Sequence, residues 1–79
     1  MIRILFFGPV AERIGSTTLL IEFNQDVTLQ KLREELAARY PQAFDIVCAT
    51  ALNGEHVFDM SQVLADNSEV AFMAKFSGG

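Results

Sequence analysis

The stretch Thr28–Tyr40, with the sequence TLQKLREELAARY, decides the fold class of this chain. Its large apolar residues recur at the three- and four-residue spacing of a helix with one apolar stripe. These residues are Leu29, Leu32, Leu36 and Tyr40. Thr28 is a suitable N-cap, Pro41 ends the helix, and Glu35 and Arg39 are spaced for an i,i+4 ion pair. A single apolar stripe predicts a helix that covers one face of a sheet.

Segments rich in β-branched and aromatic residues flank this helix on both sides and predict strands. They are Ile2–Phe7 and Thr17–Phe23 before the helix, and Ile46–Leu52, His56–Phe58 and Glu69–Lys75 after it. The first two are separated by a helical turn at Pro9–Ile14, which is short enough for an antiparallel hairpin. Asn53-Gly54-Glu55 is a turn signal between two later strands. The order predicts an α+β domain, a mixed sheet with one main helix packed on one face.

Composition and charge exclude several classes of protein. Hydrophobic residues make up 51% of the chain and charged residues 20%, which is typical of a globular domain and not of a disordered one. The net charge of -4 argues against a nucleic-acid-binding protein. The amino-terminal apolar run is too short for a signal peptide, and no run approaches transmembrane length. We therefore expect a soluble protein without membrane contact, and its single cysteine favours the reducing cytoplasm.

The chain offers few side chains for catalysis. Cys48 lies in an apolar strand segment with no histidine, lysine or arginine beside it, so we expect a buried structural thiol. His56 is the only histidine and cannot form a triad or a metal site alone; we expect it at the surface or an edge. Asp59, Asp66 and Glu69 lack the spacing of a calcium loop. The sequence therefore predicts no metal site, no bound cofactor and no active site contained in this chain.

Alternation along the first and last predicted strands assigns side chains to opposite faces of the sheet. The set expected under the helix is Ile4, Phe6, Val70 and Phe72, and the set expected on the opposite face is Leu5, Phe7, Ala71 and Met73. A large apolar face without a second covering helix is typical of a docking surface. We predict that the partner-binding residues are Leu5, Phe7, Met73, Lys75, Phe76 and Ser77.

The sequence closes with Phe76-Ser77-Gly78-Gly79. Glycine has no side chain to block close approach, so such a segment can enter a narrow active site on a partner. We expect residues 1–75 to form the domain and residues 76–79 a flexible tail. The reactive group is then the terminal carboxylate of Gly79, with Gly78 beside it.

Residues along the whole chain resemble the small-subunit family of molybdopterin synthase, sulfur carriers with the ubiquitin-like β-grasp fold. The resemblance is carried by IRILFFG at residues 2–8, Ala11-Glu12, Gly15, Val27-Thr28-Leu29, Leu32, Asn53, Asp66, EVAF at residues 69–72 and Gly78-Gly79. Where the family commonly has two prolines before its glycines, this chain has Met73-Ala74-Lys75-Phe76. The resemblance implies a β-grasp sheet with the first and last strands adjacent and parallel.

The resemblance also implies a reaction cycle in which partner proteins supply the catalysis. A ubiquitin-activating-type adenylyltransferase would use ATP to convert the Gly79 carboxylate into an acyl-adenylate, and a sulfur donor protein would then leave a thiocarboxylate. The loaded carrier would dock on the large subunit of molybdopterin synthase and donate sulfur to cyclic pyranopterin monophosphate, in molybdenum cofactor biosynthesis. The assembly would be a heterotetramer, a large-subunit dimer with one carrier at each active site.

Two other functions stay open at this point. The first is a sulfur carrier of another pathway, such as thiamine thiazole synthesis. The second is a ubiquitin-like modifier joined to lysines through an isopeptide bond, or a plain interaction module.

Overall fold

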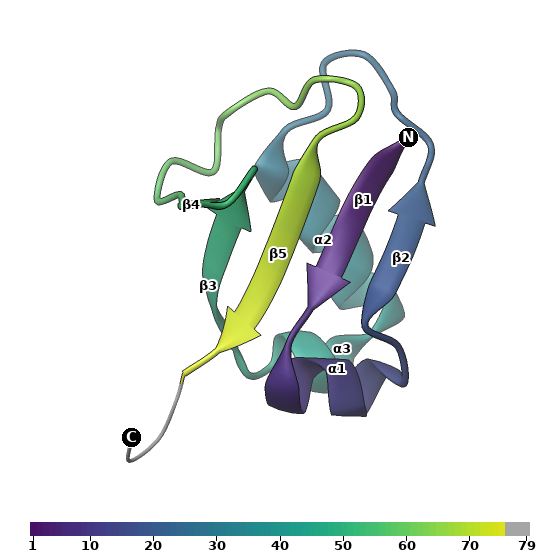
Figure 1. Cartoon of the computed structure of the whole chain (residues 1–79), viewed down its shortest axis with the longest axis vertical. Helices are drawn as coiled ribbons and strands as arrows, with labels where there is room; N and C mark the ends of the chain where they lie inside the picture. The colour runs from purple at the N-terminus through teal and green to yellow at the C-terminus, as the bar shows by residue number, and fades with distance from the viewer. Residues whose placement is uncertain (76–79) are drawn as a thin grey trace.

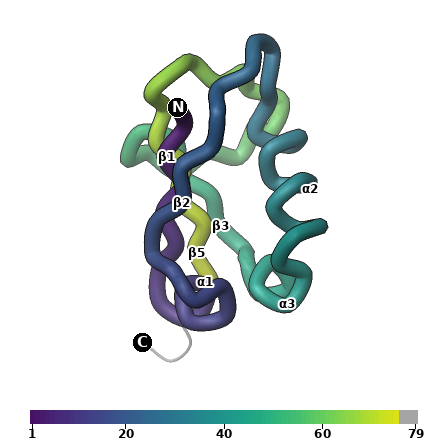
Figure 2. Tube along the Cα trace, turned by 90° about the vertical axis from the view of Figure 1, so that its right-hand side faces the viewer, coloured from purple at the N-terminus to yellow at the C-terminus, as the bar shows by residue number. Residues whose placement is uncertain are grey.

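The computed structural model describes residues 1–75, in which five strands form one mixed sheet and a long helix lies across one face (Figures 1 and 2). The strands are β1 (Ile2–Phe6), β2 (Thr18–Ile21), β3 (Val47–Leu52), β4 (Glu55–His56) and β5 (Glu69–Ala74). The helices are α1 (Gly8–Ile14), α2 (Leu29–Arg39) and α3 (Pro41–Phe44). This arrangement confirms the predicted α+β class. Within these 75 residues no helix is both long and apolar enough to cross a bilayer.

The strand order is β2-β1-β5-β3-β4, so β5 occupies the centre of the sheet. β1 and β5 are parallel, with Ile4 beside Val70 and Phe6 beside Phe72. The other strand pairs are antiparallel. The first and last strands are therefore neighbours and parallel, as predicted.

The core lies between the sheet and α2, and its residues follow the predicted periodicities. The α2 stripe of Leu29, Leu32 and Leu36 is buried. The inward-facing residues of the two central strands, which are Ile4, Phe6, Val70 and Phe72, are also buried. Thr28 caps α2, because its Oγ1 accepts a hydrogen bond of 3.1 Å from the Lys31 amide.

The structure differs from the sequence-based expectation in several local features. α2 ends before Pro41, as predicted, but a second short helix, α3, follows directly. α3 places the Phe44 ring against the Phe72 ring, with a centroid distance of 5.0 Å. No Glu35–Arg39 ion pair forms in the described chain; the Arg39 guanidinium lies 5.5 Å from the Tyr40 ring centroid instead. β2 ends at Ile21, and β4 covers residues 55–56 in place of 56–58.

Cys48 is exposed, so the prediction of a buried thiol was wrong. The cause is an irregularity in the pairing of β3 with β5. Val47 lies beside Ala74, but Ala49 lies beside Met73, so the register shifts across Cys48. A bulge of this kind leaves one residue out of the regular alternation.

Candidate functional site

The end of β5 determines where the tail segment begins. β5 runs between β1 and β3 and ends at Ala74, and Lys75 follows as an exposed residue. Figure 1 shows that this end lies at the same side of the molecule as α1 and α3, far from the amino terminus. The predicted reactive residues Gly78 and Gly79, and the predicted docking residues Phe76 and Ser77, lie outside the described residues.

The opposite end of β5 is fixed by hydrogen bonds to the β3–β4 turn. The Asn53 amide donates to the Glu69 carbonyl at 2.7 Å, and the Glu69 amide donates to the Asn53 side-chain oxygen at 2.9 Å. Asn53 and Gly54 both have positive φ, 51° and 87°, as a tight hairpin turn requires. The Asn53 side chain therefore holds the start of β5, the strand that leads to the tail. This contact gives Asn53, one of the residues that carry the family resemblance, a structural role.

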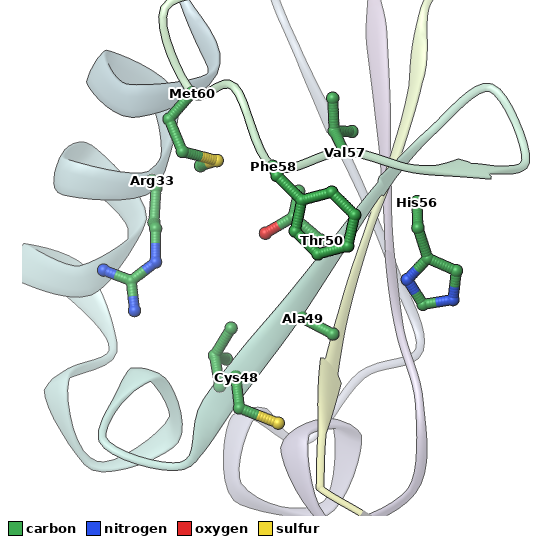
Figure 3. Close-up of a pocket in the computed structure, with 9 residues that line it drawn as sticks. Arg33, Cys48, Ala49, Thr50, His56, Val57, Phe58 and Met60 are labelled. Atoms are coloured by element: carbon green, nitrogen blue, oxygen red, sulfur yellow. The ribbon is translucent and has the colours of Figure 1, made fainter.

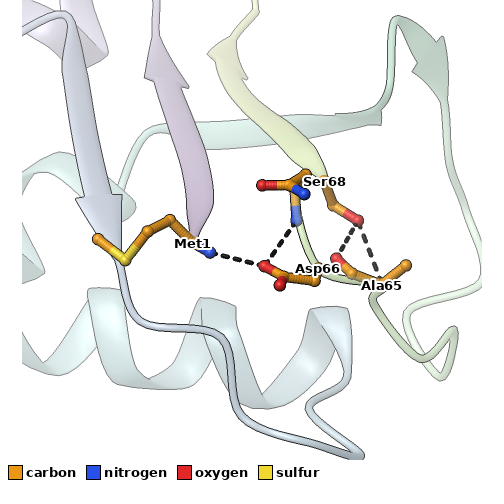
Figure 4. Close-up of polar contacts among 5 residues, drawn as sticks. Met1, Ala65, Asp66 and Ser68 are labelled. Atoms are coloured by element: carbon orange, nitrogen blue, oxygen red, sulfur yellow. Dashed lines mark hydrogen bonds and ion pairs between the residues drawn. The ribbon is translucent and has the colours of Figure 1, made fainter.

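A second polar cluster joins the amino terminus to the turn before β5 (Figure 4). The Met1 ammonium lies 2.6 Å from the Asp66 carboxylate. Hydrogen bonding to this ammonium lowers the pKa of Asp66 below its ordinary value of 3.8. The Ser68 hydroxyl donates to the Ala65 carbonyl at 2.6 Å and closes the same turn. Asp66 is therefore a structural residue at the end of the sheet remote from Lys75.

The outer face of the sheet, opposite α2, carries the predicted docking residues of β1 and β5. Leu5 lies beside Ala71, and Met73 beside Ala49. Leu5 and Met73 are half-buried, so part of each side chain is open to a partner. Ala71 is only 8% exposed, contrary to the expected open patch, because its short side chain lies between the neighbouring strands. The apolar outer face is therefore flatter and smaller than predicted.

Phe7 supplies the large apolar side chain near the tail-bearing end of the sheet. It follows β1 as the N-cap residue of α1 and has extended backbone angles. Its exposed fraction is 46%, high for a phenylalanine. Phe7 is therefore available for contact as predicted, although it belongs to the β1–α1 junction and not to the strand itself.

A shallow cleft of about 330 Å³ lies beside the end of β5, and sequence reasoning did not find it. Lys75 and Ala74 line it together with Pro9, Arg13 and Ile46. The Arg13 guanidinium donates to the Gln42 carbonyl at 2.9 Å and thereby links α1 to α3. Two cationic side chains thus flank the tail-bearing end of β5. No sequence pattern points to this group, since its members come from three separate segments.

Cys48 and His56 line another pocket, at the β3–β4 edge, together with Arg33 of α2 (Figure 3). His56 is exposed on β4, which confirms the prediction of an edge residue. Residues 1–75 contain no group of three histidine, cysteine, aspartate or glutamate side chains able to hold a metal ion.

Comparison with known proteins gives the fold a family context. A sequence profile described as the ThiS family matches residues 4–79. A search of curated protein sequences found no match. The similar solved structures include three that match over nearly the whole chain. SAMP1 from Haloferax volcanii has a TM-score of 0.82 and 22% identity, covering 99% of this chain and 98% of its own. Urm1 from Trypanosoma brucei has a TM-score of 0.76 and 20% identity, covering 99% and 94%.

The third similar structure is a complex of subunits 1 and 2 of the molybdopterin-converting factor from Helicobacter pylori. Its matching chain has a TM-score of 0.73 and 25% identity, covering 99% of this chain and 97% of that chain. These likenesses show that the domain has the ubiquitin-like β-grasp fold, as the sequence predicted.

Proposed function

This chain belongs to the ThiS family of ubiquitin-like sulfur carriers, and we propose that it is the small, sulfur-donating subunit of molybdopterin synthase. The observation that carries the proposal is the 25% identity over 99% of the chain to a protein whose solved structure is a complex of subunits 1 and 2 of molybdopterin-converting factor. The sequence resemblance to the small-subunit family points in the same direction. The partner proposed here is therefore the large synthase subunit.

The reacting group in this proposal is the carboxylate of Gly79. A carboxylate at neutral pH is anionic and a poor electrophile, so an adenylyltransferase partner joins it to AMP from ATP and releases pyrophosphate. A sulfur donor protein then delivers sulfur at the oxidation level of sulfide, which attacks the acyl carbon; the carbon–sulfur bond forms as the carbon–oxygen bond to AMP breaks, and AMP leaves. The resulting thiocarboxylate is a nucleophile with only Gly78 beside it and no side chain in its way.

The sulfur acceptor proposed for the loaded carrier is cyclic pyranopterin monophosphate, bound by the large subunit. The thiocarboxylate sulfur attacks a side-chain carbon of the pterin precursor and displaces an oxygen substituent from it, and water then cleaves the bond between the Gly79 acyl carbon and the sulfur, which restores the Gly79 carboxylate. A dithiolene contains two sulfur atoms, so two loaded carriers are consumed for each molybdopterin. The acids, bases and cations for these steps belong to the partners, since the side chains of residues 1–75 form no metal cluster or assembled catalytic group.

Docking in this proposal uses the outer face and the tail-bearing end of the sheet. Leu5, Met73 and Phe7 supply apolar contacts, and Lys75 supplies a charge beside the point where the tail begins. Because β5 is hydrogen-bonded on both sides, the tail starts from a rigid point in the centre of the sheet. A partner that binds this face therefore lies beside the point where the tail begins.

The deciding experiment is a sulfur-transfer assay with purified components. The carrier is loaded with its adenylyltransferase, ATP and a sulfur donor, and intact-mass measurement checks the replacement of one oxygen by sulfur. The loaded carrier is then mixed with the large synthase subunit and cyclic pyranopterin monophosphate, and in parallel with a thiazole synthase and its substrates. We expect molybdopterin in the first reaction only. Thiazole formation alone, or conjugation to lysines of other proteins, would assign the carrier to one of the alternative functions.

A further inference from the structure

A cleft of about 630 Å³ opens between β2 and α2, at the free edge of the sheet. Figure 2 shows β2 and α2 as two separate layers, with the connecting segment passing over one end. Leu20 and Ile21 line the cleft from the strand, and Leu32 and Glu35 line it from the helix. The cleft thus combines a strand edge with an apolar floor, and it lies on the opposite side of β1 from the tail-bearing strand.

The backbone of β2 presents unused hydrogen-bonding groups to this cleft. The Phe6 amide donates to the Thr17 carbonyl at 3.0 Å, and the register places Arg3 beside Leu20. In an antiparallel pair, the backbone amide and carbonyl of one residue bond the partner strand, and those of the next residue point away from it. Leu20 therefore directs its amide and carbonyl to the free edge, since it is an odd number of residues from Thr17.

Only part of this edge is covered by the chain itself. The Ser16 hydroxyl donates to the Thr18 carbonyl at 2.8 Å and accepts from the Thr18 amide at 3.3 Å. No such cap occurs at Leu20 among residues 1–75, and its side chain is 57% exposed. Edge strands are protected by short length, by lysine or proline, or by a bulge, and β2, with four residues, has only the first of these. The edge at Leu20 is therefore open for strand addition.

The rim of the cleft is acidic. The carboxylates of Glu22, Asp26 and Glu35 line it, against the Lys31 ammonium and the amino terminus of Met1, which is already paired with Asp66. None of these four side chains forms an ion pair within residues 1–75. A ligand that carries positive charge would thus meet an uncompensated negative rim.

We propose that the β2–α2 cleft binds an extended, basic segment of a partner protein, which adds to the sheet beside Leu20. Backbone hydrogen bonds to Leu20 supply the pairing, as in other cases of strand addition. Side chains of an added strand alternate between the two faces, so apolar residues lie beside Leu20 on the outer face. The intervening lysines or arginines point toward α2, where their stems lie over partly exposed Ile21 and their charges meet Glu35. This site lies at the β2 edge of the sheet, away from the tail-bearing end of β5, and it does not depend on the proposed function.

The test is an NMR titration of the ¹⁵N-labelled chain with a short synthetic peptide in which valine and lysine alternate. We expect shifts centred on the Leu20 and Glu22 amides. We also expect at least about tenfold tighter binding than for the matched peptide with glutamate in place of lysine. Equal binding of the two peptides, shifts centred on β3 instead, or self-association of the chain through β2 would overturn the proposal.

Two pairs of variants locate the contacts. Leu20→Pro removes the free amide donor while Leu20→Ala keeps it, and proline is tolerated at an edge position of this kind. We expect the proline variant to bind the lysine peptide at least about fivefold more weakly than the alanine variant. Glu35→Lys should weaken binding about threefold to tenfold, whereas Glu34→Lys, one residue away and outside the cleft, should not. If the Leu20→Pro variant does not fold, the Glu35→Lys and Glu34→Lys pair tests the proposal instead. Equal loss of peptide binding in these two variants would refute the assignment of the binding site to this cleft.

Discussion

Replacing Phe7 with alanine should weaken binding of the large synthase subunit by about thirtyfold, if the docking face is assigned correctly. A phenylalanine side chain offers about 200 Å² of surface, and Phe7 is 46% exposed, so roughly 90 Å² is available to a partner. At about 25 cal/mol per Å², covering this area stabilises the complex by about 2 kcal/mol. Every 1.4 kcal/mol is about a tenfold change in affinity, which gives the stated factor.

The assay is isothermal titration calorimetry of the large subunit with each carrier variant, alongside thermal unfolding followed by circular dichroism. Phe58→Ala is the matched control, because Phe58 is 91% exposed but lies at the β3–β4 edge (Figure 3). The control should bind like the wild type. An unchanged affinity for Phe7→Ala, or an equal loss for both variants, would refute the proposed docking face.

Three further predictions test the core, the tail and the polar end of the sheet. Leu32→Ala removes a buried side chain from under the sheet and should cost about 2–5 kcal/mol of unfolding free energy in a denaturant titration, whereas exposed Leu20→Ala should cost far less. Deleting Gly79 should abolish thiocarboxylate formation in the mass assay, because a shift of about 3.5 Å takes the carboxyl out of the adenylation site, yet calorimetric docking should persist; a loaded deletion variant would contradict the mechanism. Asp66→Asn should lower the melting temperature at neutral pH, and the difference from wild type should vanish as the pH falls below about 3.8, because a carboxylate with a lowered pKa stabilises the fold only while it is ionised. A constant difference across that range would show that Asp66 acts without its charge.

The parts of the fold that could be predicted are those in which large apolar side chains recur with a regular period along the sequence. Leu29, Leu32 and Leu36 recur with the helical period and are all buried under the sheet. Thr28 was recognisable as a cap because its hydroxyl is the type that accepts a first-turn amide. The parallel pairing of β1 with β5 joins the two ends of the chain, and no local pattern encodes it; it came from the family resemblance.

The parts that could not be predicted depend on neighbours distant in sequence. Cys48 sits at a register shift, and an alternation of period two cannot reveal where that period breaks. α3 has only four residues, too few to give a periodic signal, and it forms because Phe44 packs on Phe72. Ala71 was expected to be part of an exposed apolar patch on the outer face, but it is buried. The burial of a small side chain depends on the residues of the adjacent strands, which local alternation does not reveal.

The candidate site also has a part that could be predicted from the sequence and a part that could not. Leu5, Met73 and Lys75 could be placed from alternation and from their position near the tail. The cleft beside the end of β5 could not be found, because α1 and the segment before β3 meet there only in the folded chain. Sequence periodicity therefore predicted which side chains share the outer face, and only the tertiary fold shows the cleft beside it.

The two ends of β5 have different surroundings. At the start of the strand, Asn53 bonds the Glu69 backbone and the Met1–Asp66 pair closes the adjoining turn, so polar contacts hold the strand in place. At its end, apolar Ala74 gives way to exposed Lys75, and the nearby cations and apolar side chains are open to a partner. In the proposed cycle one carboxylate reacts at two partners while the domain supplies no catalytic group. Both partners must then recognise the surface around the same end of β5, and competition between adenylyltransferase and large subunit for one carrier follows from that shared surface.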